Sequence, residues 1–318
     1  SNTAVGQEAL VSNTTADNNT AVGYQAGYSN SVGAYNTFLG NAAGYTNTAS
    51  NNTAVGYNAL YYNTSGTANN ALGGSDSVNG SALALNTTGS YNAAFGISAL
   101  NANTSGSENA AFGGNALKSN TTGNENNAFG TSTLYSNSTG SYNTAVGSQA
   151  MGDGGNLATG SDNCAFGSWH DGVVEGPLAG LTSGSRNLAF GNGAMRSLTT
   201  GADNVSIGYF SGAYSNALTT GSSNTLIGNY ASTTSAGASN QIVIGASNVG
   251  QGDNYVSIGK GGTNYIYAQF SSSATWTKAS DQRIKQNIND TAIGLDFIEK
   301  LRVVTYNWKP SKIGRAHV

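Results

Sequence analysis

Residues 2–6 read Asn-Thr-Ala-Val-Gly, and the same five residues return at 19–23, 52–56 and 143–147. Variants that keep the first Asn and the last Gly continue along the chain at 36–40, 69–73, 92–96, 109–113, 126–130, 163–167, 187–191, 204–208 and 224–228. Most steps from one motif glycine to the next are 17 residues, and the others are 16, 20, 23 or 24. Self-similarity at one dominant period indicates a repeat architecture.

A second glycine divides the unit into a constant part and a variable part. In the units from Gly66 onward this glycine lies 7 residues before the next motif glycine, as Gly66 does before Gly73. The other part is 10 residues in regular units, but 16 from Gly73 to Gly89 and 17 from Gly167 to Gly184. Because all the length variation falls in one part, we expect the insertions to emerge on one side of the folded repeat.

The residue types within the unit predict short strands between turns. Asn bonds to its own backbone and Gly tolerates positive φ, so their periodic pairing is turn chemistry. The Ala-Val, Ala-Phe and Ser-Ile segments between the turns are too short for helices and favour strands. Two strands and two turns per unit predict one coil of an all-β, parallel β-solenoid, with coils about 4.8 Å apart and like residues stacked in ladders.

A coil of 17 residues encloses few side chains. We expect the Val, Phe or Leu of the motif to point inward, together with Ala-Leu pairs such as Ala59-Leu60, Ala99-Leu100 and Ala116-Leu117. One or two large apolar side chains contribute about 1.5–3 kcal/mol each. Ordering the backbone costs about 1–2 kcal/mol per residue. The solenoid therefore needs further burial, and a homotrimer would supply it while covering exposed strand edges.

Composition and charge exclude several classes of protein. The chain of 318 residues holds 45 glycines and only 8% charged residues, and no apolar run has the length of a membrane span. Residues 1–250 hold 3 basic and 10 acidic side chains, so a basic nucleic-acid surface is not supported there. The single cysteine excludes an internal disulfide framework and a thiolate zinc site. No motif implies a cofactor, and we expect no membrane insertion.

The repeat carries a resemblance over residues 1–260. Its Asn-x-Ala-Val/Ile-Gly motifs resemble the heads of trimeric autotransporter adhesins, the YadA-like left-handed parallel β-roll, and the shafts of bacteriophage tail fibres. The unit of 17 residues is longer than the repeat of those heads. The resemblance implies a homotrimeric, β-roll-like solenoid that displays binding surfaces.

A second resemblance begins after a connector at residues 261–278, in which Tyr-Ile-Tyr-Ala at 265–268 predicts a last strand. Residues 279–288 read Ala-Ser-Asp-Gln-Arg-Ile-Lys-Gln-Asn-Ile, and Leu-Asp-Phe-Ile and Val-Thr-Tyr-Asn-Trp follow. Residues 279–311 resemble the start of the endosialidase-type intramolecular chaperone, an autoproteolytic serine peptidase at the C-termini of phage tail spikes and fibres. The resemblance implies a domain that trimerises, templates folding of the upstream fibre and then cuts itself off.

By this resemblance the catalytic pair for self-cleavage is Ser280 and Lys285, with the cut at a peptide bond of Ser280 on a side left open. A serine hydroxyl without a histidine can use a lysine as base when burial lowers the lysine pKa. The alternative is that Ser280 and Asp281 only cap a short helix beginning near Arg283. Because most of the domain is missing, we expect no cleavage by this chain.

Both ends of the sequence carry expectations of their own. Residues 312–318, Lys-Ile-Gly-Arg-Ala-His-Val, are what a common sequencing adapter encodes when read in frame, which indicates an artefactual tail. The chain begins inside a repeat without Met, so we expect its natural N-terminus upstream.

The longest insertion is the candidate recognition loop. It contains Trp169, His170, Asp171 and Glu175, which a host surface glycan or receptor could contact, although a solvated loop is an equal alternative. One His and two carboxylates are too few for a metal site. Cys164 replaces a motif Thr and is interpreted as a small coil residue, not a nucleophile. Asn-x-Ser/Thr triplets at one repeat position, such as Asn103, are interpreted as turns, not as glycosylation sites.

Three functions from different classes fit these observations: a receptor-binding fibre of a phage-like particle, a bacterial surface adhesin, and a tail spike that degrades glycans. The first is favoured because the chaperone-like segment occupies the place of an adhesin's stalk and membrane anchor. The sequence therefore predicts a location on a virion tail or a cell surface.

Overall fold

The computed structural model describes residues 1–152, 158–168, 176–261, 264–270 and 273–278. The chain divides into two compact units, Ser1–Ala279 and Ser280–Val318. The second unit lies wholly outside the described residues.

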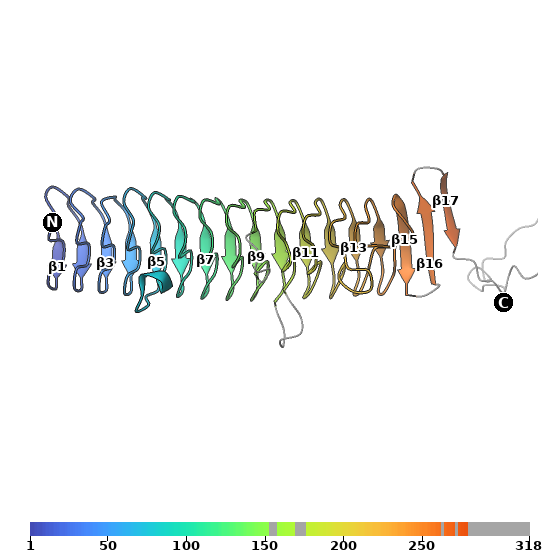
Figure 1. Ribbon diagram of the computed structural model, residues 1–318, viewed down its shortest axis with the longest axis horizontal. Helices are drawn as coiled ribbons and strands as arrows, with labels where there is room; N and C mark the ends of the chain where they lie inside the picture. The colour runs from blue at the N-terminus through green and yellow to red at the C-terminus, as the bar shows by residue number, and fades with distance from the viewer. Residues whose placement is uncertain (153–157, 169–175, 262–263, 271–272, 279–318) are drawn as a thin grey trace, which may run out of the picture. The chain divides into compact units, whose positions relative to one another are not determined.

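The first unit is a parallel β-solenoid in which coils stack in sequence order (Figure 1). One strand of three residues marks each coil. The strands are β1 (Thr3–Val5), β2 (Thr20–Val22), β3 (Thr37–Leu39), β4 (Thr53–Val55), β5 (Asn70–Leu72), β6 (Ala93–Phe95), β7 (Ala110–Phe112), β8 (Asn127–Phe129), β9 (Thr144–Val146), β10 (Cys164–Phe166), β11 (Leu188–Phe190), β12 (Val205–Ile207), β13 (Thr225–Ile227) and β14 (Ile242–Ile244).

Like residues pair with like residues along the stack. Ala94 of β6 lies opposite Ala111 of β7, and Phe95 lies opposite Phe112. The register persists across inserted coils, so that Ala165 of β10 pairs with Ala189 of β11. The predicted parallel β-solenoid with coils of about 17 residues is confirmed.

The expectation of two strands per coil is wrong. The segment after each motif glycine, which we call the turn side, has left-handed residues at alternate positions; Ser98 has φ 59° and Leu100 has φ 50°. This alternation excludes an extended strand, which needs negative φ throughout. The backbone still bonds between coils, since the Leu100 N–H donates to the Ala116 carbonyl over 3.0 Å.

The expected inward position of the motif Val, Phe or Leu is also wrong. The middle residue of each strand points inward: Ala94 is fully buried, whereas Phe112 remains 37% exposed. Adjacent strand residues face opposite sides, so burying the alanine turns the larger residue outward. The Ala-Leu pairs were correctly predicted, because Ala99 and Leu100 are both fully buried on the turn side.

The thin interior balances large and small residues between its two sides. Phe38 occupies the inward strand position that alanine holds in neighbouring coils, and it is fully buried. Opposite it, the leucine position of the turn side is Gly27 and Gly44 in successive coils. A Cβ on Gly27 would lie 2.7 Å from the Phe38 ring. The Phe38 ring therefore fits because both facing positions on the turn side are glycine.

Two columns of buried asparagines bind the coils together. In the first column, the side-chain Oδ1 of each motif Asn accepts a hydrogen bond from the backbone N–H of the motif Asn in the next coil. The bond from Asn109 N–H to Asn92 Oδ1, for example, is 3.1 Å long. In the second, Asn103 Nδ2 donates to Asn86 Oδ1 over 2.7 Å and to the carbonyl of Gly106 over 2.8 Å. Asn103 is fully buried. Its side chain is committed to the fold, in agreement with the interpretation of the Asn-x-Ser/Thr triplets as turns.

The insertions enter the coil at more than one point. Residues 75–81, which include the 3-10 helix η1 (Val78–Gly80), follow a motif glycine directly and project past the strand ends at the lower edge (Figure 1). Residues 213–217 instead follow the leucine position, and the Leu218 N–H closes this insertion on the Gly212 carbonyl over 2.9 Å. The variable part of the unit thus offers two separate sites for insertion.

The C-terminal end of the solenoid changes to antiparallel pairing. β15 (Tyr255–Lys260) continues the stack next to β14, and then pairs antiparallel with β16 (Asn264–Gln269). The strand expected at residues 265–268 is present in β16. It is not the last, because β17 (Ser273–Lys278) follows and pairs antiparallel with β16.

Candidate functional site

The site residues predicted from the sequence lie outside the described residues. These are Ser280 and Lys285 of the proposed self-cleaving pair and Trp169, His170, Asp171 and Glu175 of the recognition loop. Their roles stay predictions. The structure does describe Cys164, which is half-buried in β10, where desolvation raises the pKa of its thiol. A protonated thiol is a poor nucleophile.

The feature that sequence reasoning missed is a continuous apolar surface on the strand side. The third residue of every strand from β1 to β14 points outward and is large and apolar, and Ile258 of β15 extends the row. We call this row the outer apolar column. Its members are Val5, Val22, Leu39, Val55, Leu72, Phe95, Phe112, Phe129, Val146, Phe166, Phe190, Ile207, Ile227, Ile244 and Ile258.

The side chains of this column are partly exposed to solvent and stack on one another, so the column is part of the protein surface and not of its core. Phe129 is 42% exposed and Phe190 is 55% exposed. The rings of Phe95 and Phe112 stack with centroids 4.7 Å apart, and those of Phe112 and Phe129 with centroids 5.0 Å apart. At about 4.8 Å per coil the column is roughly 70 Å long. Monomeric proteins rarely expose so extended an apolar patch, which marks an interaction surface.

A parallel column on the same face changes character along the solenoid. The first residue of each strand also points outward, and it is small or polar in the early coils, as at Thr20, Ala110 and Asn127. Near the C-terminal end it becomes larger and apolar, as at Leu188 and Ile242. The strand face is therefore most apolar close to β15.

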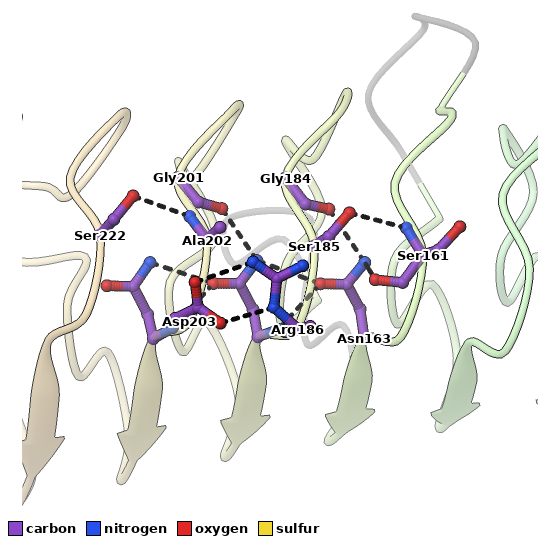
Figure 2. A network of polar contacts seen from close by, with 11 residues as sticks. Ser161, Asn163, Gly184, Ser185, Arg186, Gly201, Ala202, Asp203 and Ser222 are labelled. Atoms are coloured by element: carbon purple, nitrogen blue, oxygen red, sulfur yellow. Dashed lines mark hydrogen bonds and ion pairs between the residues drawn. The ribbon is translucent and has the colours of Figure 1, made fainter.

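A pair of charged residues links two neighbouring coils. Arg186 and Asp203 occupy equivalent positions on neighbouring coils and form a two-point ion pair at 2.6 and 2.9 Å, seen in Figure 2. The hydrogen bonds from the guanidinium hold the pKa of the Asp203 carboxyl below its ordinary value. The pair is exposed and links two coils without forming a catalytic arrangement.

A signal for the outer apolar column was present in the motif. Its middle strand residue is alanine in ten of the fourteen strands β1 to β14, and its third is always large. A coil too thin to hold two facing large side chains must bury the small one, so the large one has to face outward.

Neither a metal-binding cluster nor a membrane-spanning helix occurs in the described ranges. They contain no group of three or more His, Cys, Asp or Glu side chains placed to hold a metal ion. In the same part of the chain, no helix has the length and apolarity to span a membrane.

Comparison with known proteins gives a match at the C-terminus. Residues 280–318 match the family model described as chaperone of endosialidase. No curated protein and no solved structure matches the chain. The match covers the second unit alone, and the repeat is characterised by its own structure.

Proposed function

We propose that this protein is a homotrimeric, receptor-binding fibre of the phage tail-fibre kind. In the complete protein, its C-terminal domain would drive trimerisation and then cleave itself off through Ser280 and Lys285. The match of residues 280–318 to the chaperone of endosialidase supports this assignment. A chaperone of this kind following directly on a β-solenoid favours a fibre over a membrane-anchored adhesin.

The observation that carries the proposal is the outer apolar column. Three parallel solenoids packed about a common axis would bury one such column each, and the equal spacing of coils lets every Phe, Val or Ile meet its counterparts. Each large side chain buried in this way contributes about 1.5–3 kcal/mol. The stabilisation is repeated at every coil, which compensates for the small interior of a single chain.

Analytical ultracentrifugation of the 318-residue chain tests this interface. We expect a trimer for the unmodified chain, and dissociation to monomers for the double variant Phe112→Asp and Phe129→Asp. Both positions are partly exposed, so the charge does not enter the interior of the coil.

The matched control is Val32→Asp. Val32 is 60% exposed and lies outside the outer apolar column, and the control should remain trimeric. A trimer that tolerates both aspartates would show that this column is not the interface, and a monomeric unmodified chain requires the same comparison in a chain that carries the complete C-terminal domain.

Recognition is assigned to the loop that contains Trp169, His170, Asp171 and Glu175. Loops vary without disturbing the stack and are common sites of binding. Deleting residues 169–175 should abolish attachment to host cells while the trimer persists. Unchanged attachment by an intact trimer would remove the loop from the binding role.

A further inference from the structure

A cluster of aromatic side chains lies on the turn side, near the C-terminal coils. Tyr209, Phe210 and Tyr230 come from neighbouring coils, and Tyr214 comes from the insertion at 213–217. The Tyr214 and Tyr230 rings lie 4.6 Å apart between centroids and are tilted by 58°. The Tyr209 and Tyr230 rings lie 5.5 Å apart at 88°, and Tyr209 and Phe210 lie 4.7 Å apart at 63°.

This arrangement differs from the stacked rings of the repeat. The rings of Phe112 and Phe129 are within 3° of parallel, so each covers the face of the next. The rings of Tyr209, Tyr214 and Tyr230 are tilted and do not cover one another face to face. Tyr214 is 62% exposed and Tyr209 is 39% exposed, so the cluster presents an open aromatic platform.

Arg196 adds a positive charge at the border of the platform. Its guanidinium carbon lies 5.1 Å from the centroid of Phe210. Its Nε is buried and has no hydrogen-bond partner within the described part of the chain. Arg186, in contrast, already bonds to Asp203. Because its Nε is buried, a ligand would have to reach the terminal nitrogens of the Arg196 guanidinium, which lies against an aromatic ring and forms no ion pair within the described residues.

We propose that this platform binds a saccharide that carries a carboxylate. The weakly positive C–H groups of a pyranose ring pack against the electron-rich face of an aromatic ring, and tyrosine hydroxyls exchange hydrogen bonds with sugar hydroxyls. A planar guanidinium pairs with a carboxylate through two parallel hydrogen bonds. Tyr214 and Tyr209 supply the ring faces, and Arg196 supplies the partner for the carboxylate. The inference rests on the proposed role in surface recognition and names a second site and its ligand class.

The probes are an array of uronate-containing oligosaccharides, beginning with trigalacturonate, and the same compounds after reduction of the carboxyl group. We expect the 318-residue chain to bind at least one acidic member, and to bind its reduced form at least tenfold more weakly. Arg196→Gln should reduce binding of the acidic member at least tenfold without changing binding of the reduced one. Tyr214→Ala should weaken both.

Tyr91→Ala is the matched control, because Tyr91 is 65% exposed and lies outside the aromatic cluster; it should bind like the unmodified chain. Thermal unfolding followed by circular dichroism establishes that each variant is folded, and Arg196→Lys, which keeps the charge, should retain part of the binding. The proposal is overturned if no acidic member binds above its reduced form, or if folded Arg196→Gln binds normally. Ultracentrifugation of the same samples reports the trimer separately, so a failure of the fibre proposal is recognised on its own.

Discussion

At the scale of single residues, the solenoid depends on left-handed backbone at positions that are not glycine. Ala68 has φ 55° and Leu100 has φ 50°, in a conformation that costs most L-residues about 1–2 kcal/mol. This cost is offset by hydrogen bonds. The left-handed residues let consecutive N–H and carbonyl groups point along the stack and bond to the next coil. Leucine is retained at some of these positions because its side chain fills the interior.

Ala68 offers a direct test, since it is only partly buried and its methyl contributes little to the core. Ala68→Gly should stabilise the protein by about 0.5–1 kcal/mol, because glycine adopts positive φ without steric cost. Ala34, also partly buried, lacks the positive φ, and Ala34→Gly should destabilise by about 0.5–1 kcal/mol. Chemical denaturation measures both changes, and equal signs for the two variants would contradict the argument.

The ion pair between Arg186 and Asp203 makes a pH-dependent contribution to folding stability, and the sign of this contribution follows from the pKa shift of Asp203. The folded-state pKa of Asp203 is below its ordinary value of 3.8, and the largest cause is hydrogen bonding from Arg186. The stabilisation is therefore present above about pH 4 and lost as the pH falls through the folded-state pKa. Carboxyl NMR titration should give a midpoint for Asp203 below 3.8, and Arg186→Gln should return it to the ordinary value. An unchanged midpoint in Arg186→Gln would assign the shift to another cause.

At the scale of elements, the second asparagine column ends partway along the solenoid. It runs through Asn103 and Asn120 to Asn137, and in later described coils the equivalent positions are Leu181, Leu198 and Leu218. Leu198 and Leu218 are fully buried. The same corner of the coil is thus held by hydrogen bonds in one half and by apolar packing in the other. An asparagine at this position needs asparagines in the adjacent coils as hydrogen-bond partners, and a leucine needs apolar neighbours to pack against.

Placing a leucine in the asparagine half of this column should therefore strongly destabilise the protein. Asn103→Leu removes the donor to Asn86 Oδ1 and leaves that buried atom unsatisfied, whereas Asn120 Nδ2 loses one acceptor and keeps the Gly123 carbonyl. The expected loss is about 1–3 kcal/mol for the unsatisfied group, measured by chemical denaturation. Leu198→Met, within the leucine half, should cost less than about 1.5 kcal/mol. A neutral Asn103→Leu would show that the column does not bind the coils together.

The motif spacing was sufficient to predict the coil but not the direction of its side chains. The recurrence of Asn and Gly at 17 residues indicated the stack and its ladders correctly. The three-residue strand contains too little alternation to decide whether Ala94 or Phe95 faces inward. The turn side was mistaken for a second strand because Leu100 is an unusual residue for a left-handed conformation. The outer apolar column follows from the thinness of the coil, for which the motif carries a signal, whereas the aromatic platform depends on the turn-side conformation, which the sequence alone does not reveal.

At the scale of the whole molecule, repetition creates a problem of alignment. Neighbouring coils are so alike that three chains displaced by one coil would still match Val with Val and Ala with Ala. Such a slip changes few contacts, and the energy difference between registers is small. The strand face breaks this symmetry most clearly where it becomes strongly apolar near Leu188 and Ile242. A folding domain attached beyond β17 would align the three chains at that end before the fibre forms.

A domain with this task is needed only once, which is the reason to expect its removal by self-cleavage. In a chain that carries the complete chaperone domain, Ser280→Ala and Lys285→Ala should each leave the precursor uncut, because one removes the nucleophile and the other its base. Trimers should still form, since alignment does not depend on the cut. Ser273→Ala, a nearby serine in β17, should be processed normally. Electrophoresis of the purified products decides the matter: two fragments from Ser280→Ala would refute the assigned pair, and an uncut Ser273→Ala would mean that any change near the junction blocks cleavage.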